Sequence, residues 1–202
     1  MTTSGRTYGG RSAAQRSRER RERFVQAVRE LITEEGLAPL TVDIICQRAS
    51  VSKPYFYDEF TSKEDVFDVC ADDLYSRLWT GMQTALAEVP RPQRVRAALQ
   101  SIIHALASNP ADARLYMESP GFPRLLERQR RAVEEFSNHI TKEAMPFTGR
   151  VKKSINRQLG TRALVAGAAD LIIAWLHGDV DTDEESLIAT LTAATLGAAE
   201  RL

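Results

Sequence analysis

The chain has 202 residues, of which 43% are hydrophobic, and its 27 basic side chains are balanced by 27 acidic ones. This length and hydrophobic content suffice for a sizeable buried core, so disorder of most of the chain is excluded. The sequence contains no uninterrupted run of about 18 apolar residues and no apolar signal core at its N-terminus, so a cytoplasmic protein that enters no membrane is expected.

The N-terminal segment is basic. The first 23 residues contain seven arginines and two glutamates, a net charge of +5. Residues 1–12, rich in Gly, Ser and Arg, are predicted to form a flexible basic arm. Such an arm either stays solvated or follows the backbone or minor groove of nucleic acid. A first helix is predicted from about Ser12 to Glu35, with Gly36 as its C-terminal stop.

A short helix and a tight turn are predicted next. Thr41 is a suitable N-cap because its hydroxyl can accept a backbone hydrogen bond. The apolar residues that follow have the spacing of a buried helical face: Ile45, Cys46 and Ala49. Ser50 and Val51 form the turn. Cys46 and Cys70, the only two cysteines, both fall at inward helical positions and are predicted to be buried small hydrophobes, with a disulfide or redox switch as the alternative.

A second short helix is predicted after the turn. Ser52 is its expected N-cap, and Lys53 and Pro54 lie in its first turn, where a missing N–H costs nothing. Two phenylalanines at i and i+4 face inward and two tyrosines face outward: Phe56 and Phe60, and Tyr55 and Tyr57. Two short helices joined by a tight turn, with basic and aromatic residues on the second, have the layout of a DNA-binding helix-turn-helix.

The segment resembles the DNA-binding domain of the TetR family of transcriptional repressors, whose pattern is roughly T-x-x-x-I-A-x-x-A-G-V-S-K-x-x-x-Y-x-x-F-x-S-K-E. The matching residues are Thr41, Ile45, Ala49, Val51, Ser52, Lys53, Tyr57, Phe60, Ser62, Lys63 and Glu64. Cys46, Ser50 and Asp58 depart from the pattern. A left-handed Ser50 in place of the usual glycine is expected to cost about 1 kcal/mol.

The second helix of such a motif lies in the major groove. The residues predicted to contact DNA are Thr41, Ser52, Lys53, Pro54, Tyr55, Tyr57 and Lys63. The first turn of the second helix, from Lys53 to Tyr55, faces base edges, whereas the resemblance places Tyr57 and Lys63 on phosphates. Packing between helices is the alternative for the two tyrosines. Asp58 is expected to point away from DNA or to accept a hydrogen bond from a cytosine amino group.

The remainder of the chain is also predicted to be helical. Ser62, with Asp65 three residues later, is expected to cap a long helix that ends near Val89. Further helices are predicted at about 93–108, 110–118, 121–145, 154–177 and 183–201, separated by breaks that contain proline or glycine. The expected fold is all-α, with a three-helix helix-turn-helix domain at 13–62 followed by a larger helical ligand-binding and dimerisation domain at 63–202.

The last two predicted helices are apolar on more than one face. Gly160, Gly167 and Ala174 repeat every seven residues on the first. The apolar stripe beside them comprises Leu164, Ala168, Leu171, Ile172 and Trp175. On the last helix the apolar residues are Leu187, Ile188, Leu191, Ala194, Thr195, Ala198 and Leu202. Because two apolar faces need two partners, a homodimer through these helices is predicted, with internal packing alone as the alternative.

The C-terminal part also contains large side chains that could line a cavity. The predicted ligand-binding residues are Trp79, Met82, Tyr116, Met117, Phe122, Phe136, His139 and Trp175. Core packing is the alternative for each of them, but the family resemblance implies a pocket for a small apolar or amphipathic ligand. No cofactor and no metal site are predicted.

The favoured function is a repressor that binds a palindromic operator in double-stranded DNA as a dimer and is released from it by a small molecule. A DNA-binding regulator controlled by a protein partner is the second possibility. An all-helical enzyme is the third, but the sequence has no Glu-x-x-His pair, phosphate-binding glycine loop, zinc motif or nucleophile elbow.

Overall fold

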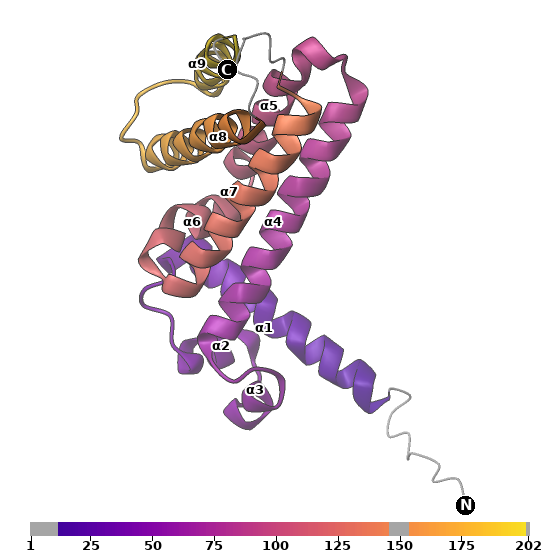
Figure 1. Cartoon of the computed structure of the whole chain (residues 1–202). Coiled ribbons are helices and arrows are strands. Elements are labelled where there is room, and N and C mark those ends of the chain that lie inside the picture. The colour runs from indigo at the N-terminus through magenta and orange to yellow at the C-terminus, as the bar shows by residue number, and fades with distance from the viewer. Residues whose placement is uncertain (1–11, 146–153, 201–202) are drawn as a thin grey trace, which may run out of the picture. The chain divides into compact units, whose positions relative to one another are not determined.

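The computed structural model describes residues 12–145 and 154–200, and every regular element in these ranges is a helix (Figure 1). The predicted all-α fold is therefore confirmed. Contacts divide the chain into two compact units, Met1–Cys70 and Ala71–Leu202, which we call the N-terminal and C-terminal units. The predicted arm, apart from Ser12, and the apolar position Leu202 lie outside the described residues.

The N-terminal unit contains three helices and the beginning of a fourth. They are α1 (Ala13–Glu35), α2 (Val42–Ala49), α3 (Lys53–Glu59) and α4 (Lys63–Glu88). Ser12 and Gln15 begin α1 with a capping box, in which each side chain accepts a hydrogen bond from the other residue's backbone N–H. Gly36 ends α1 at a φ of 84°, a left-handed value that glycine adopts without strain.

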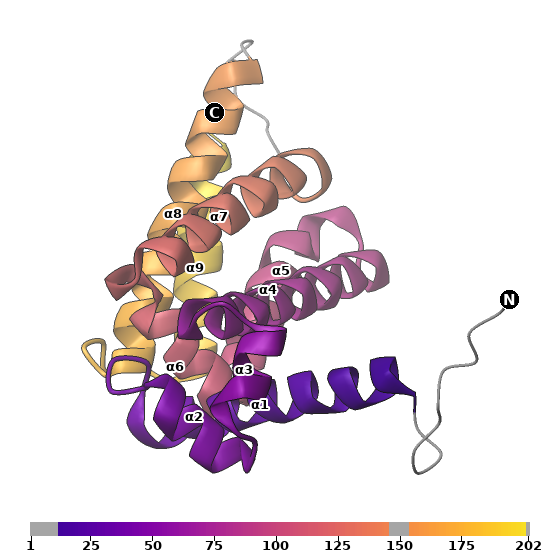
Figure 2. The ribbon, with the colours of Figure 1, turned by 90° about the horizontal axis from the view of Figure 1, so that it is seen from below.

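Three phenylalanine rings form the centre of the N-terminal unit, where α1, α2 and α3 gather into one bundle (Figure 2). The Phe24 ring centroid lies 5.2 Å from that of Phe56 and 6.2 Å from that of Phe60, both in edge-to-face geometry. The ring centroids of Phe56 and Phe60 are 5.6 Å apart. Such aromatic pairs contribute about 0.5–1.5 kcal/mol each beyond their buried area. The cluster therefore holds α3 against α1.

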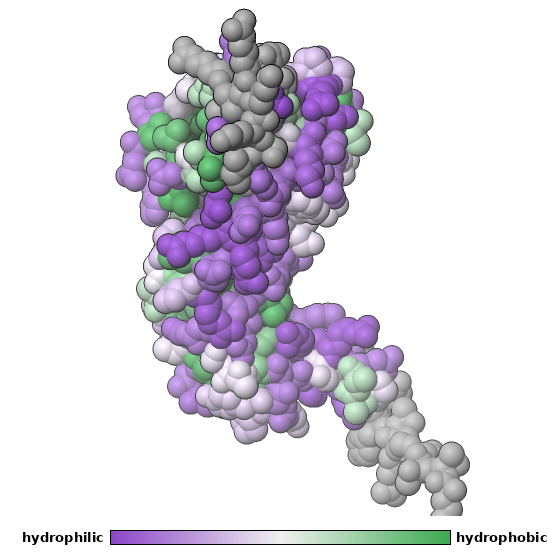
Figure 3. Space-filling model, viewed as in Figure 1, coloured by the Kyte–Doolittle hydropathy of each residue, from purple (hydrophilic) through white to green (hydrophobic). Residues whose placement is uncertain are grey.

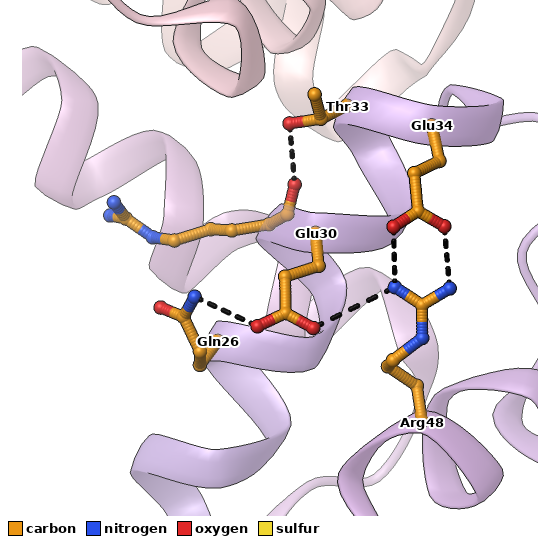
Figure 4. A network of polar contacts seen from close by, with 6 residues as sticks. Gln26, Glu30, Thr33, Glu34 and Arg48 are labelled. Atoms are coloured by element: carbon orange, nitrogen blue, oxygen red, sulfur yellow. Dashed lines mark hydrogen bonds and ion pairs between the residues drawn. The ribbon is translucent and has the colours of Figure 1, made fainter.

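Arg48 links α2 to the C-terminal half of α1 (Figure 4). Its guanidinium donates to both carboxylate oxygens of Glu34, at 2.9 and 2.6 Å, and lies 3.6 Å from Glu30. The hydrogen bond from Arg48 is the main reason why the pKa of Glu34 is lowered. Because this bidentate pair is exposed, solvent screens it, and its main effect is to orient α2.

The turn between α2 and α3 depends on a left-handed serine. Ser50 has φ 52° and ψ 44°, and its N–H closes the turn by donating to Gln47. Arg23 of α1 donates to the carbonyl oxygens of Ala49, at 2.6 Å, and Ser50, at 3.0 Å. The arginine satisfies carbonyls that the end of α2 leaves without a helical partner. It therefore supports a backbone conformation that serine adopts at a cost.

We predict that Ser50→Gly stabilises the protein by about 0.5–1 kcal/mol, because glycine has no Cβ to strain in the left-handed region. Urea unfolding monitored by circular dichroism measures the change. Ser50→Ala is the matched control, since it deletes the hydroxyl but keeps the Cβ. Equal stability of the glycine and alanine variants would contradict the strain account.

The C-terminal unit contains the rest of α4 and five further α-helices within the described residues. They are α5 (Arg94–Ala107), α6 (Pro110–Glu118), α7 (Pro123–Glu143), α8 (Ser154–His177) and α9 (Glu184–Ala199), with the short 3₁₀ helices η1 (Arg91–Gln93) and η2 (Ser119–Gly121). α7 packs on α8, α5 packs on α9, and α6 contacts both α5 and α8. Asp183 caps α9 by accepting from the Ser186 N–H at 2.7 Å.

A half-buried ion pair joins α4 to α6. Both terminal nitrogens of Arg77 donate to Asp112, at 2.7 and 2.8 Å, and its Nε donates to Asp73 at 3.1 Å. The Asp112 side chain is almost fully buried, so its charge depends on this bidentate partner. The ion pair therefore fixes the part of α4 that belongs to the C-terminal unit against α6.

Candidate functional sites

The first candidate site is the exposed face of α3. Phe56 is buried, whereas the other residues predicted to contact DNA from this helix are exposed: Lys53, Pro54, Tyr55 and Tyr57. The residues Tyr55 and Tyr57 are 49% and 58% exposed to solvent. Asp58 is also exposed. Neither tyrosine is buried between helices, so the alternative of interhelical packing does not explain why they are there.

Lys53 already has an acidic partner. Its ammonium lies 2.5 Å from the carboxylate of Asp43 in the first turn of α2, and both side chains are exposed. This hydrogen bond is the largest reason why the pKa of Lys53 is raised. A phosphate or a base edge would therefore compete with Asp43 for the lysine.

Arginines near the start of α1 hold the end of α3. The Glu59 carboxylate accepts from Arg20 at 2.9 Å and from the Ser17 hydroxyl at 2.8 Å. Arg21 donates to the Glu59 carbonyl oxygen at 3.0 Å. The Arg20 guanidinium also lies 4.9 Å from the centre of the Tyr55 ring. Part of the basic charge counted with the N-terminal segment thus orients α3.

The predicted caps behave differently from one another. The Thr41 hydroxyl accepts from the Ile44 N–H at 3.3 Å, as expected of an N-cap. Ser52 occupies the N-cap position of α3, but its side chain makes no cap hydrogen bond. One reason is Pro54 at the second helical position, because proline has no N–H to donate. The prediction of a side-chain cap at Ser52 was therefore wrong.

Lys63 has a structural partner. Its ammonium donates to the carbonyl oxygen of Leu40 at 2.7 Å and lies 5.8 Å from the centre of the Phe67 ring. In the same first turn of α4, the Asp65 carboxylate accepts from the N–H groups of Thr61 and Ser62 at 2.8 and 3.2 Å. A lysine has three donors. A phosphate contact by Lys63 would use donors other than the one on Leu40.

The second candidate site is a cavity of about 90 Å³ within the C-terminal unit. A single water needs only about 10–15 Å³ on a comparable measure, so the cavity has room for a small organic group. It is bounded by α4, α5, α6, α7, α8 and α9. Among the predicted ligand-binding residues, three line it: Met82, Tyr116 and Phe136.

The other five predicted ligand residues are not among the lining side chains: Trp79, Met117, Phe122, His139 and Trp175. Trp79 instead packs against Phe136, with 5.3 Å between ring centroids, and against His139 at 5.0 Å. The Trp175 indole donates to the Thr182 carbonyl oxygen at 2.8 Å and fixes the turn between α8 and α9. Trp79 therefore supports the wall of the cavity from behind.

Five polar side chains line an otherwise apolar cavity: Tyr75, Tyr116, Gln129, Thr161 and Thr195. The Thr161 hydroxyl is satisfied by the Arg157 carbonyl oxygen at 2.9 Å. Burial raises the pKa of the Tyr116 hydroxyl, and the neighbouring Gln129 side chain opposes this with a smaller lowering effect. Burial likewise raises the pKa of Tyr75. Both tyrosines are therefore neutral hydrogen-bonding groups at physiological pH.

The N-terminal helices carry the family signature. Residues 24–70 match the family model described as "Bacterial regulatory proteins, tetR family". The match and the relatives described below support a TetR-family transcriptional regulator. The match extends from the phenylalanine cluster on α1 to the first part of α4, so it covers the whole helix-turn-helix. Similarity to a family of regulators disfavours the enzyme alternative.

Two curated TetR-family relatives come from Mycolicibacterium smegmatis. The chain is 34% identical to the HTH-type transcriptional regulator EthR over 124 residues, which are 59% of this chain and only 57% of that relative. It is 25% identical to the HTH-type transcriptional activator FasR over 180 residues, 84% of this chain and 78% of that one. The two names include both a regulator and an activator.

Solved structures show the same fold beyond the DNA-binding segment. The fatty acid degradation regulator FadR from Bacillus halodurans superposes with a TM-score of 0.71. The similarity covers 91% of this chain and 97% of FadR, with 16% sequence identity. At this identity the likeness shows the TetR-type fold alone.

Sequence reasoning missed several residues that line the cavity. Tyr75, Gln129 and Thr161 gave no motif signal. The α8 residues Leu164 and Ile172 had been assigned to a stripe beside the predicted dimer face, but both line the cavity. Their three- and four-residue spacing indicated an inward face but could not show that the face borders empty space.

We predict that the two cavity tyrosines make the protein sensitive to alkaline pH. Because the folded state raises the pKa of Tyr75 and Tyr116, their contribution is complete below pH about 10 and falls as pH rises above the unfolded value. The free energy of unfolding should fall by up to about 1.4 kcal/mol per pH unit for each tyrosine. Urea titrations from pH 9 to 11, about the tyrosine range, should show a shallower fall for Tyr75→Phe, and an unchanged slope would contradict the prediction.

Proposed function

We propose that this protein is a cytoplasmic, dimeric TetR-family regulator that binds a palindromic operator through α3. In this proposal it acts as a repressor whose affinity for DNA is lowered by a small molecule in the cavity of the C-terminal unit. The single observation that carries the DNA-binding part is the exposed α3 face on a buried aromatic cluster, within the segment that matches the family. A recognition helix needs this combination of a fixed backbone and free side chains.

The proposed contacts to DNA fall into two groups. Lys53, Pro54 and Tyr55 are at the N-terminal end of α3, which is the part of a recognition helix that meets base edges. Tyr57, Lys63 and the hydroxyl groups of Thr41 and Ser52 are proposed to contact phosphates. The Ser52 hydroxyl is suited to this role because the helix cap does not use it.

We propose that ligand control acts through α4. This helix is continuous from Lys63 to Glu88 and so belongs to both units. Tyr75 and Met82 line the cavity, whereas Lys63, at the start of the helix, binds the backbone at Leu40. Lys63 and Tyr75 are separated by about 18 Å of helix, at 1.5 Å per residue. A ligand that favours one position of α4 would shift the balance between two DNA-reading arrangements.

The ion pair between Lys53 and Asp43 gives a specific test of DNA binding. Asp43→Asn should tighten binding to the selected operator by about two- to fivefold at low salt, because it frees Lys53 and removes a charge that repels phosphate. The gain should shrink as salt rises. Duplexes selected from a random pool by the purified protein, followed by anisotropy titration at two salt concentrations, provide the measurement.

Glu34→Gln is the matched control for this test. It makes the same change in net charge but frees Arg48 instead of Lys53. Equal tightening by the two variants would indicate a general effect of charge and would contradict a role of Lys53 at the DNA. Failure of the selection to enrich any palindromic sequence would overturn the proposed operator binding itself.

The proposed dimer rests on the exposed apolar face of α8 and α9. Leu159 and Leu171 of α8 are 58% and 42% exposed. Figure 3 shows hydrophobic surface at the position of α8. The segment Asn156–His177 is even long and apolar enough to cross a membrane, and only 11% of its most apolar window is buried. The exposed charges Arg162 and Asp170 within it favour a protein partner over lipid.

The small residues on this face provide a test. A Cβ added at Gly167 of α8 or at Gly197 of α9 meets no atom within 4 Å, so the subunit itself has room for a side chain there. We predict that Gly167→Arg leaves the fold intact and converts the dimer to monomer, because an interface of small residues cannot accept a guanidinium. Sedimentation velocity measures the mass.

Gly121→Arg is the control, because Gly121 also has open space around its added Cβ but belongs to η2. It should leave the dimer unchanged. A dimer that survives both Gly167→Arg and Gly197→Arg would place the interface elsewhere, and a monomeric wild-type protein would overturn the dimer altogether.

A further inference from the structure

We propose that the cavity binds a neutral, mainly apolar molecule whose carbonyl-type oxygen accepts hydrogen bonds from the Tyr75 hydroxyl and the Gln129 amide. This inference rests on the proposed function, in which a ligand occupies the cavity, and it specifies the chemistry of that ligand. It is carried by two buried donors that have no partner and by a lining without charge.

The two donors are unusual because they are buried and unpaired. Tyr75 is 4% exposed and Gln129 is 7% exposed. Within the described residues, neither the Tyr75 hydroxyl nor the Gln129 Nε2 has a hydrogen-bond partner. Buried polar atoms are nearly always paired, since an unpaired one loses its bonds to water and gains none. Both side chains line the same cavity, so a ligand acceptor there could satisfy both.

The donors belong to one group of side chains. The Tyr75 ring centroid lies 6.3 Å from that of Tyr116, and the Gln129 side chain lies close enough to Tyr116 to influence its pKa. We call Tyr75, Tyr116 and Gln129 the polar corner. The rest of the lining is apolar apart from Thr161, whose hydroxyl is satisfied, and Thr195 of α9. The cavity therefore offers one hydrogen-bonding region and an apolar remainder, which matches a molecule with one polar group.

The polar corner also selects against charge. No acidic, basic or histidine side chain is among the residues that line the cavity. Arg128 lies close by, with its guanidinium 4.6 Å from the centre of the Tyr75 ring, but it is not among the lining residues. Its Nε donates to Asp72 at 2.7 Å, and its Nη1, which has no hydrogen-bond partner in the described part of the chain, lies 3.9 Å from the Glu135 carboxylate. A carboxylate or an ammonium group would thus enter without a counter-ion among the lining side chains, which is costly in an apolar site.

The position of Arg128 has a second consequence. A cation over the ring draws electron density from the tyrosine, and it opposes the effect of burial on the pKa of Tyr75. The hydroxyl thus becomes a better donor while it remains protonated. Tyr75 is therefore suited to donate to a ligand oxygen and not to accept from a ligand N–H.

Three probes of similar size separate these features: heptan-2-one, hexanoate and 2-methylheptane. They offer a neutral carbonyl, a carboxylate and no polar group, respectively. Binding to the full-length chain is measured by ligand-detected NMR and by the shift in thermal unfolding midpoint. We expect heptan-2-one to bind best and hexanoate to bind worst. Equal binding of the ketone and the hydrocarbon would overturn the proposal.

Tyr75→Phe is the decisive variant because it removes only the unpaired hydroxyl. It should weaken the binding of heptan-2-one by about three- to tenfold, leave that of 2-methylheptane unchanged, and not lower the unfolding midpoint of the free protein. Tyr116→Phe is the contrasting variant, since its hydroxyl is not among the unpaired buried atoms and its loss should lower the midpoint. A lower midpoint for Tyr75→Phe with unchanged ketone binding would show that the hydroxyl serves the fold, and would overturn the proposal.

The same samples separate this inference from the proposed ligand control. If heptan-2-one binds as expected but leaves operator affinity unchanged in the anisotropy assay, the polar corner is confirmed and the proposed control of DNA binding by this cavity fails. If no probe binds while an amide or ester of the same chain length does, the shared carbonyl chemistry is upheld. If none of these neutral carbonyl compounds binds, the inference is overturned.

Discussion

α3 depends on a buried contact that is not part of the helix itself. A helix of seven residues is far too short to be stable alone in water. Its orientation comes from the Phe24, Phe56 and Phe60 rings beneath it and from the Glu59 carboxylate at its end. Because the buried groups come from one face, the opposite face is left for Lys53 and the tyrosines. Without this cluster the exposed residues would have no fixed geometry to present to DNA.

Most of the fold followed from local patterns in the sequence. The three- and four-residue spacing of apolar side chains predicted the helices, and the end of α4 at Glu88 is one residue from the predicted end near Val89. Proline and glycine marked the breaks because they act on the backbone itself. The functional details were harder to predict, since pairs such as Lys53–Asp43 and Arg20–Glu59 join residues from different helices. Only tertiary packing brings those charges together.

The cavity was likewise only partly predictable, because sequence patterns indicate helices and large side chains but not how the helices pack around empty space. Large aromatic side chains identified the region, but a large residue can stand behind a wall as well as in it, as Trp79 does against Phe136. The residues that give the cavity its chemistry, Tyr75 and Gln129, are ordinary helical positions in the sequence. Their importance lies in what they lack, which is a partner for a buried donor. A missing partner has no sequence signal.

Charge in this protein is arranged by pairing more than by net value. The chain is neutral overall, and several of its basic side chains already hold acidic or carbonyl groups, among them Arg20, Arg23 and Lys53. DNA affinity then depends on which pairs can open when phosphate arrives. The exposed Lys53–Asp43 pair can exchange its carboxylate for a phosphate at small cost. The largely buried Glu59 cannot release Arg20 so easily, because its own charge would remain without a partner. The buried pair therefore fixes the position of α3, whereas the exposed pair leaves Lys53 able to contact DNA.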